Sequence, residues 1–192
     1  MTRTVSDARN RLLGTASGLF YAEGLHSVGV DRILAEAKVT RATMYRHFAG
    51  KEDLVLAYLA EADRATRQNV EAGVAAATND ADAVRAVARG IAGHIQIEGF
   101  RGCAFLNAVA EYADPAHPVH IAVQAHRKWF LDTVTGLLAR VGDTPAELDG
   151  RHFVMLRDGA MAAGCLADPG PIGDTFREAV EGILRARTAP QA

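Results

Sequence analysis

The segment "KVTRATMYRHFAGKEDL", which runs from Lys38 to Leu54, decides the fold prediction for this chain. Up to Lys51 it carries four Lys or Arg residues and one His but no Asp or Glu, although the whole chain has a formal net charge of -2. Carboxylates in this stretch would repel a phosphate backbone, whereas Arg side chains pair with guanine edges and phosphates. The segment therefore predicts a surface that meets a polyanion.

Two helices joined by a short turn are expected around this segment. Residues Val30–Ala37 have the apolar spacing of a helix, and Thr40–Phe48 fits a second, shorter helix with an apolar inner face. Gly50 interrupts the pattern, and a longer helix is expected from Lys51 to about Glu71. This layout is that of a helix-turn-helix, whose second helix enters the major groove of DNA.

The rest of the chain also has a helical pattern, because Ala is abundant and no stretch alternates apolar and polar residues for the length of a strand. The stretch "AGVAAATNDAD" marks a hinge or a helix junction. Further helices are expected over 81–98, 103–113, 116–141, 146–167 and 172–187, with prolines at their joints. The predicted fold class is all-α: a three-helix DNA-binding domain over residues 1–50, followed by a larger helical regulatory and dimerisation domain over residues 51–192.

Charge and composition agree with this division. Residues 1–50 hold seven Lys or Arg against four Asp or Glu, whereas the remainder holds fourteen against nineteen. A basic head on an acidic body indicates that the head binds a polyanion. No apolar run is long enough for a membrane span, and the N-terminus lacks the pattern of a signal peptide. A cytoplasmic protein with no membrane partner is expected.

The stretch "ILAEAKVTRATMYRHFAGKEDL", residues 33–54, resembles the helix-turn-helix of the tetracycline-repressor (TetR) family of bacterial transcriptional regulators. The family pattern runs Ile-Ala-x-x-Ala-Gly-Val-Ser-x-Gly-Thr-hydrophobic-Tyr-x-His/Tyr-Phe-x-x-Lys-x-x-Leu. The preceding "LFYAEGLHSVGV" also resembles the family, and the strong similarity covers roughly residues 8–58. The resemblance implies a ligand-responsive transcriptional regulator, in most cases a repressor. It would bind a palindromic double-stranded DNA operator as a homodimer and be released by a small-molecule effector.

Three positions depart from the family pattern. Lys38 stands where the family usually has Gly in the turn, and a side chain in a left-handed conformation costs about 1 kcal/mol. Ala42 replaces a common Gly at the start of the second helix, where its methyl group could touch a thymine methyl. Gly29 replaces the Ser or Thr that usually caps the preceding helix, and glycine is a tolerable cap.

The resemblance assigns roles to the second helix position by position. A hydroxyl that only happens to reach outward from half-buried packing is the alternative for Tyr45. The residues expected to contact bases are Arg41, Ala42 and Arg46, and those expected to contact phosphates are Thr40, Thr43, Tyr45, His47 and Lys51.

In the family, the last two helices form a four-helix bundle with their copies. The small residues of "DGAMAAG", from Asp158 to Gly164, suit a close helix–helix approach, although they could also pack inside the monomer. The final helix carries an apolar stripe. The expected dimer interface comprises Gly159, Ala163, Phe176, Val180, Ile183 and Leu184.

Family members commonly bind a small molecule within the helical body. Apolar residues of the central helices would line that site, and plain core packing is the alternative for each of them. Asn107 and Glu111 lie one turn apart and could anchor a polar ligand group, or they could only cap and solvate. The expected ligand-binding residues are Ile91, Ile95, Phe105, Asn107, Glu111, Trp129, Phe130 and Met155.

No cofactor or metal site is predicted. Cys103 and Cys165 are far apart in the sequence, and the histidines show no HxxxH pair. Cys103 is either a redox-sensitive thiol or a packed core residue. The second hypothesis is an enzyme with an all-helical body. Against it, the chain has no nucleophile elbow, no phosphate-cradling glycine loop and no convincing acid/base pair. A helical interaction module that does not bind DNA is the third.

Overall fold

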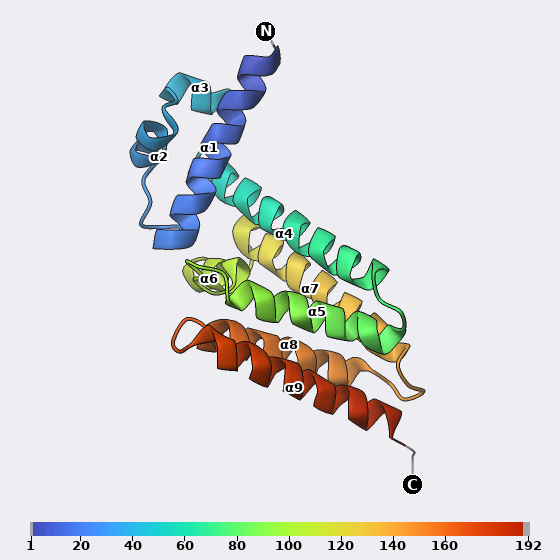
Figure 1. Ribbon diagram of the computed structural model, residues 1–192. Helices are drawn as coiled ribbons and strands as arrows, with labels where there is room; N and C mark the ends of the chain where they lie inside the picture. Colours follow the sequence, from blue (N-terminus) through green and yellow to red (C-terminus); the bar gives the residue numbers. More distant parts are fainter. Residues whose placement is uncertain (1, 190–192) are drawn as a thin grey trace. The chain divides into compact units, whose positions relative to one another are not determined.

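The computed structural model describes residues 2–189, and within them the chain is all helical, as predicted (Figure 1). The described residues contain nine helices and no strand. The all-α fold class is thereby confirmed. The helices are α1 (Thr2–Glu23), α2 (Val30–Ala37), α3 (Arg41–Tyr45), α4 (Lys51–Ala75), α5 (Asp80–Ile95), α6 (Ala104–Glu111), α7 (Pro118–Ala139), α8 (Glu147–Ala163) and α9 (Pro169–Thr188).

The chain forms two compact units that are not simply its two ends. The first unit extends to Arg64 and also includes Ala104–Gln124, so that α6 and the start of α7 belong with the N-terminal helices. The second unit comprises Ala65–Cys103 and the residues from Ala125 onward. The helices α4 and α7 each contribute to both units. The predicted division after residue 50 stays a prediction, since these units group the chain by internal packing.

The turn between α2 and α3 has the geometry that the sequence required. Helix α2 begins after Gly29, which caps it without a side chain, and ends at Lys38 in the left-handed region with φ 53°. The amide of Lys38 donates to the carbonyl of Ala35, and the amide of Val39 donates to the carbonyl of Leu34. These bonds close the end of α2 and turn the chain sharply toward α3.

Helix α3 is shorter than predicted. It begins after Thr40, whose hydroxyl accepts a hydrogen bond from the amide of Thr43 at 3.2 Å. It ends at Tyr45 rather than Phe48, because the amides of His47 and Phe48 both donate to the carbonyl of Met44. The last turn is thereby tightened into a non-helical connection to α4.

The core of the first unit is formed by apolar residues that face inward from α1, α2, α3 and α4. Met44 is the residue through which α3 is anchored, and it is fully buried. Helix α1 packs against both α2 and α3, and the guanidinium of Arg9 on α1 lies 5.2 Å from the ring centroid of Phe48. Burial of such side chains contributes about 1.5–3 kcal/mol each. The buried core residues include Leu12, Ile33, Met44, Phe48 and Leu54.

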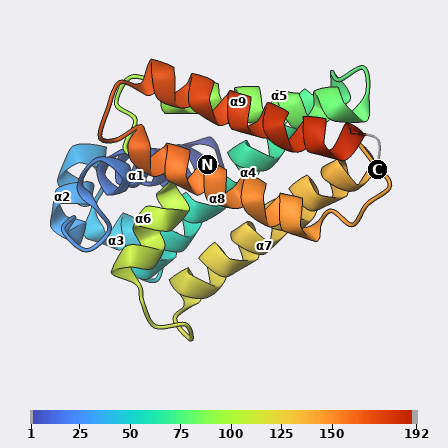
Figure 2. The same cartoon turned by 90° about the horizontal axis from the view of Figure 1, so that it is seen from below.

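In the second unit, α9 lies beside both α5 and α8 (Figures 1 and 2). An aromatic series runs through this core, with ring centroids 6.3 Å apart for Phe130 and Phe153 and 5.6 Å apart for Phe153 and Phe176. Helices α7 and α9 each begin with a proline. Proline is favoured at the first position of a helix, because the amide that it lacks would have no partner within the helix there. Among the helices of residues 2–189, none is both long and apolar enough to span a bilayer.

Candidate nucleic-acid interface

The outer side of α3 carries exposed polar and basic residues over a buried anchor. Arg41, Ala42 and Arg46 are exposed, and Tyr45 is 54% exposed, whereas Met44 is fully buried. The alternative in which Tyr45 is half-buried therefore does not describe this conformation. An inward apolar side and an outward cationic side on a single short helix can present donors to a polyanion.

Arg41 and Arg46 differ in their surroundings. Arg41 forms an ion pair with Asp31 of α2, and both side chains are exposed. Arg46 donates to the hydroxyl of Thr43 at 3.2 Å, and within residues 2–189 it makes no ion pair. An exposed ion pair contributes little free energy, so a phosphate can replace the carboxylate at Arg41 at small cost. Both guanidiniums lie on the surface of the first unit.

The two threonines of α3 are already engaged with each other. Their hydroxyl oxygens are 2.9 Å apart, and Thr40 also accepts from the amide of Thr43. The hydroxyl of Thr40 thus serves as the N-cap of α3, a local role that is typical of threonine at this position. Removal of such a cap typically costs about 1 kcal/mol.

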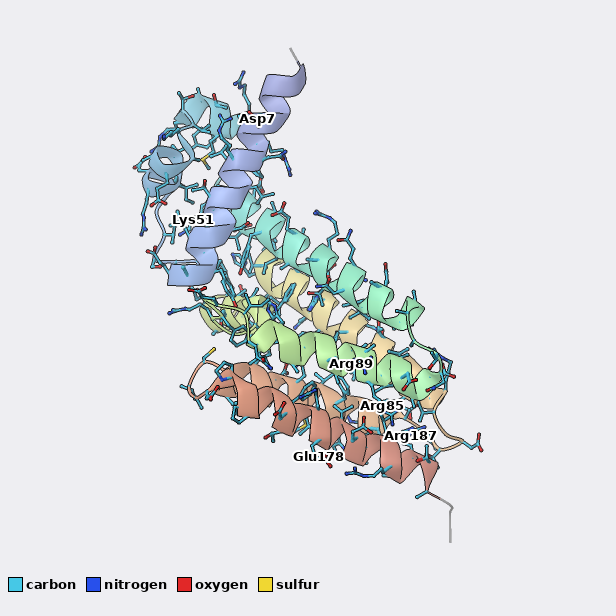
Figure 3. The ribbon with its side chains drawn as sticks, viewed as in Figure 1. Asp7, Lys51, Arg85, Arg89, Glu178 and Arg187 are labelled. Carbon is cyan, nitrogen blue, oxygen red and sulfur yellow. The ribbon has the colours of Figure 1, made fainter. Side chains whose placement is uncertain are left out.

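His47 and Lys51 lie less openly than the sequence suggested. The Nε2 atom of His47 is buried and has no hydrogen-bond partner in the described part of the chain. Lys51 begins α4 (Figure 3), and its ammonium donates to the carbonyl of His26 at 3.1 Å. Burial lowers the pKa of Lys51, and the nearby carboxylate of Glu111 acts in the opposite direction. Their phosphate contacts stay predictions.

Glu111 makes contacts that no pattern in the sequence predicts. Its carboxylate accepts hydrogen bonds from the backbone amides of Leu25 at 2.7 Å and His26 at 2.5 Å. These amides belong to the connection between α1 and α2, 85 residues or more away in the sequence. No local sequence pattern signals a contact of that separation. The sequence left open whether Glu111 anchors a ligand group or only caps and solvates, and in this structure its carboxylate binds the connection before α2.

The eight predicted ligand-binding residues are divided between the two units. Phe105, Asn107 and Glu111 belong to the first unit and the other five to the second. Within the second unit, Ile95 and Phe130 are buried in the core, and the ring of Trp129 lies 4.1 Å below the guanidinium of Arg67. Ile91 is half-buried, and Met155 is 70% exposed on α8.

Met155 lies instead in an apolar groove of about 610 Å³ on the surface formed by α8 and α9. Four of the predicted dimer residues line the same groove: Gly159, Ala163, Phe176 and Ile183. The other two, Val180 and Leu184, are almost completely buried within the second unit. These two residues of α9 therefore face the core of their own chain.

Both cysteines are free thiols. Cys103 is buried and its sulfur accepts a hydrogen bond from the guanidinium of Arg157 at 3.2 Å, whereas Cys165 is exposed. Within residues 2–189, no group of three His, Cys, Asp or Glu side chains is arranged to hold a metal ion.

These features define a class of protein: a helix-turn-helix protein with a cationic α3 above a buried core. A model of the family described as "Bacterial regulatory proteins, tetR family" matches residues 12–58. The crystal structure of SCO4454, a TetR-family transcriptional regulator from Streptomyces coelicolor, is 65% identical in sequence, with a TM-score of 0.94. The match covers 96% of this chain and 97% of that one.

The chain belongs to the TetR family and is a DNA-binding transcriptional regulator. The family is not enzymatic, in agreement with the leading hypothesis from the sequence. Among curated proteins, the HTH-type transcriptional regulator LmrA from Bacillus subtilis is 25% identical over 126 residues, which is 64% of this chain and 67% of that protein. The HTH-type transcriptional activator FasR from Mycolicibacterium smegmatis is 40% identical over 53 residues, which is 28% of this chain and only 24% of that protein.

Proposed function

We propose that the protein is a homodimeric repressor that binds a palindromic operator through α3 and is released by a small-molecule effector. The observation that carries the DNA-binding part is the exposure of Arg41 on α3 and of Arg46 directly after it, whereas Met44 of the same helix is buried and anchors it. Arg41 and Arg46, with Ala42, are proposed to contact bases. Thr40, Thr43, Tyr45, His47 and Lys51 are proposed to contact phosphates.

The test of DNA binding uses the full chain and duplexes from the region that flanks its gene. Affinity is measured by fluorescence anisotropy at two or more salt concentrations. Phosphate contacts release counterions, so the logarithm of the affinity is expected to fall steeply with the logarithm of the salt concentration. Binding that is absent, or that does not respond to salt, would favour the interaction module over the regulator.

The homodimer is proposed because a single helix-turn-helix contacts only a few base pairs. Two recognition helices about 34 Å apart, related by two-fold symmetry, would read a palindromic site. The groove on α8 and α9 supports this proposal, since it exposes Met155 and Leu156 beside the half-buried Ile183 and several small residues. Monomeric proteins rarely expose such a contiguous apolar surface without using it.

Gly159 offers a direct test of the dimer. A side chain at this position would meet nothing within 4 Å in the monomer, yet it would project into the groove. The substitution Gly159→Arg is therefore expected to leave the fold intact and to give a monomer in sedimentation velocity. Gly90→Arg on α5 is the matched control, because Gly90 is also helical, exposed and unobstructed. Dimers that persist in Gly159→Arg would contradict the α8–α9 interface.

The effector and the direction of regulation need separate experiments. Ligands that bind one conformation more tightly shift the DNA-binding equilibrium by that difference in affinity. Native mass spectrometry of the purified protein is expected to reveal a bound small molecule that lowers operator affinity when added back. Deletion of the gene is expected to raise transcription from the flanking promoter. A fall in transcription would identify an activator, the role that the name of FasR carries for that protein.

A further inference from the structure

The connection between α1 and α2 is held by groups from three other parts of the first unit, and Glu111 is the central one. Its carboxylate is carried by the last residue of α6. It accepts two backbone hydrogen bonds from this connection, from the amides of Leu25 and His26. A carboxylate that binds two successive amides makes stronger hydrogen bonds than a neutral acceptor would.

Gly24 shows that this approach is close. Its φ is +96°, a conformation that side chains rarely adopt, and an added Cβ would lie only 3.1 Å from the Oε1 atom of Glu111. The backbone conformation therefore favours glycine at this position, and a Cβ atom there would also require the Glu111 carboxylate to shift by a few tenths of an ångström. The chain reverses direction here, immediately after α1, and presents its next two amides to the carboxylate.

His26 contacts three groups that belong to other residues. Its amide donates to Glu111, its carbonyl accepts from the ammonium of Lys51, and its ring lies 4.6 Å, between centroids, from the ring of Tyr112. The Tyr112 ring also lies 4.6 Å from the ring of His117. The Nε2 atom of His117 lies 3.3 Å from a carboxylate oxygen of Glu52, at the start of α4.

These contacts join the start of α2 to helices that are remote in the sequence. Helix α2 begins only four residues after His26, and it leads directly through the Lys38 turn into α3. A displacement of residues 24–29 would therefore move the first helix of the helix-turn-helix. The carboxylate of Glu111 fixes two amides of this connection at once.

We propose that Glu111 is a positioning residue for DNA recognition. It fixes the connection between α1 and α2 and thereby the placement of α2 and α3. The proposal rests on DNA binding through α3, and it does not depend on the identity of any effector.

The test compares Glu111→Gln with Glu98→Gln in the full chain. Both substitutions remove one negative charge, but Glu98 is exposed and forms no ion pair within residues 2–189. Affinity is measured for the native operator and for a scrambled duplex of equal length. Glu111→Gln is expected to lower operator affinity about tenfold, the scale of one charge-assisted hydrogen bond, with little change for the scrambled duplex.

The ratio of the two affinities separates positioning from simple loss of structure. A variant that is merely less stable has fewer folded molecules, so both affinities would fall together with the melting temperature. That result would overturn the proposal, as would an affinity ratio equal to that of the parent or of Glu98→Gln. The parent chain is measured first, because failure of the parent to bind any duplex would instead count against DNA binding itself.

Amide signals give an independent measurement that needs no DNA. In ¹H–¹⁵N spectra, the Leu25 and His26 amides are expected to shift and to exchange faster with solvent in Glu111→Gln, while the amides of α9 stay unchanged. Gly24→Ala should perturb the same two signals, since its methyl group would press on the carboxylate. Unchanged signals in both variants would show that the carboxylate does not hold this connection and would sink the proposal.

Discussion

Two arginines, Arg46 of the first unit and Arg187 of the second, are used in opposite ways. Arg46, which directly follows α3, is exposed, and its guanidinium donates a hydrogen bond to the hydroxyl of Thr43. In the second unit, Arg187 of α9 is buried; it donates to the carboxylate of Asp149 at 2.7 Å and to backbone carbonyls that include that of Leu138 at 3.0 Å (Figure 3). The comparison teaches that a count of cations does not locate a polyanion site. What matters is whether the chain itself already supplies their acceptors.

Arg187 should therefore matter for stability and not for DNA. We expect Arg187→Met to lower the free energy of unfolding by about 3 kcal/mol, because it leaves the half-buried Asp149 carboxylate and several backbone carbonyls without their donor. Urea denaturation at fixed protein concentration measures this loss.

Arg185→Met is the matched control on the same helix. Arg185 pairs with Glu178, and both side chains are largely exposed. Its loss should cost less than about 1 kcal/mol, as is typical of surface ion pairs. Equal effects of the two substitutions would mean that the hydrogen bonds of Arg187 add nothing to folding.

Arg46 should show the converse pattern. We expect Arg46→Ala to weaken operator binding by about 1–3 kcal/mol and to relax sequence preference at one position of each half-site, as loss of a base contact would. The free energy of unfolding should change by less than about 0.5 kcal/mol, because the side chain is exposed.

Competition binding against a series of single-base operator variants measures this preference. Arg177→Ala, which removes an exposed arginine from α9, is the control and should bind the operator as the parent does. A uniform loss over all operator variants would instead identify Arg46 as a phosphate contact.

Local patterns in the sequence predicted the helix-turn-helix well. Val30–Ala37 was predicted with the bounds that α2 has, because a glycine, a regular apolar stripe and a sharp turn all act within a few residues. The end of α3 was wrong by three residues, since the Met44 carbonyl accepts from two successive amides. That choice depends on how Phe48 is buried, which the local sequence does not determine.

Contacts between residues that are distant in the sequence are the part of the structure that local patterns predict least well. The stripe that includes Val180 and Leu184 was correct as an apolar face, but a pattern on one helix cannot say whether its own chain or a second copy covers that face. Met155 is predicted to line a ligand site, with core packing as the alternative, and its 70% exposure on α8 argues against the core alternative. The two contacts of Glu111 could not be predicted, because its partners are backbone amides, which no side-chain pattern reveals.

Lys38 provides the smallest expected effect. It extends the comparison to a cation whose backbone lies in the strained left-handed region. Within residues 2–189 it is the non-glycine residue with positive φ, at 53°. Lys38→Gly and Lys38→Ala both remove the charge, but only the first removes the Cβ atom. We expect the glycine variant to be more stable than the alanine variant by about 1 kcal/mol, the cost of a Cβ in the left-handed region. Thermal unfolding measures the difference, and equal melting temperatures would mean that the turn relaxes when the lysine is replaced. If the ammonium of Lys38 contributes only its charge, operator affinity should fall equally in both variants. A further loss in one variant would show that the turn geometry itself sets the placement of α3.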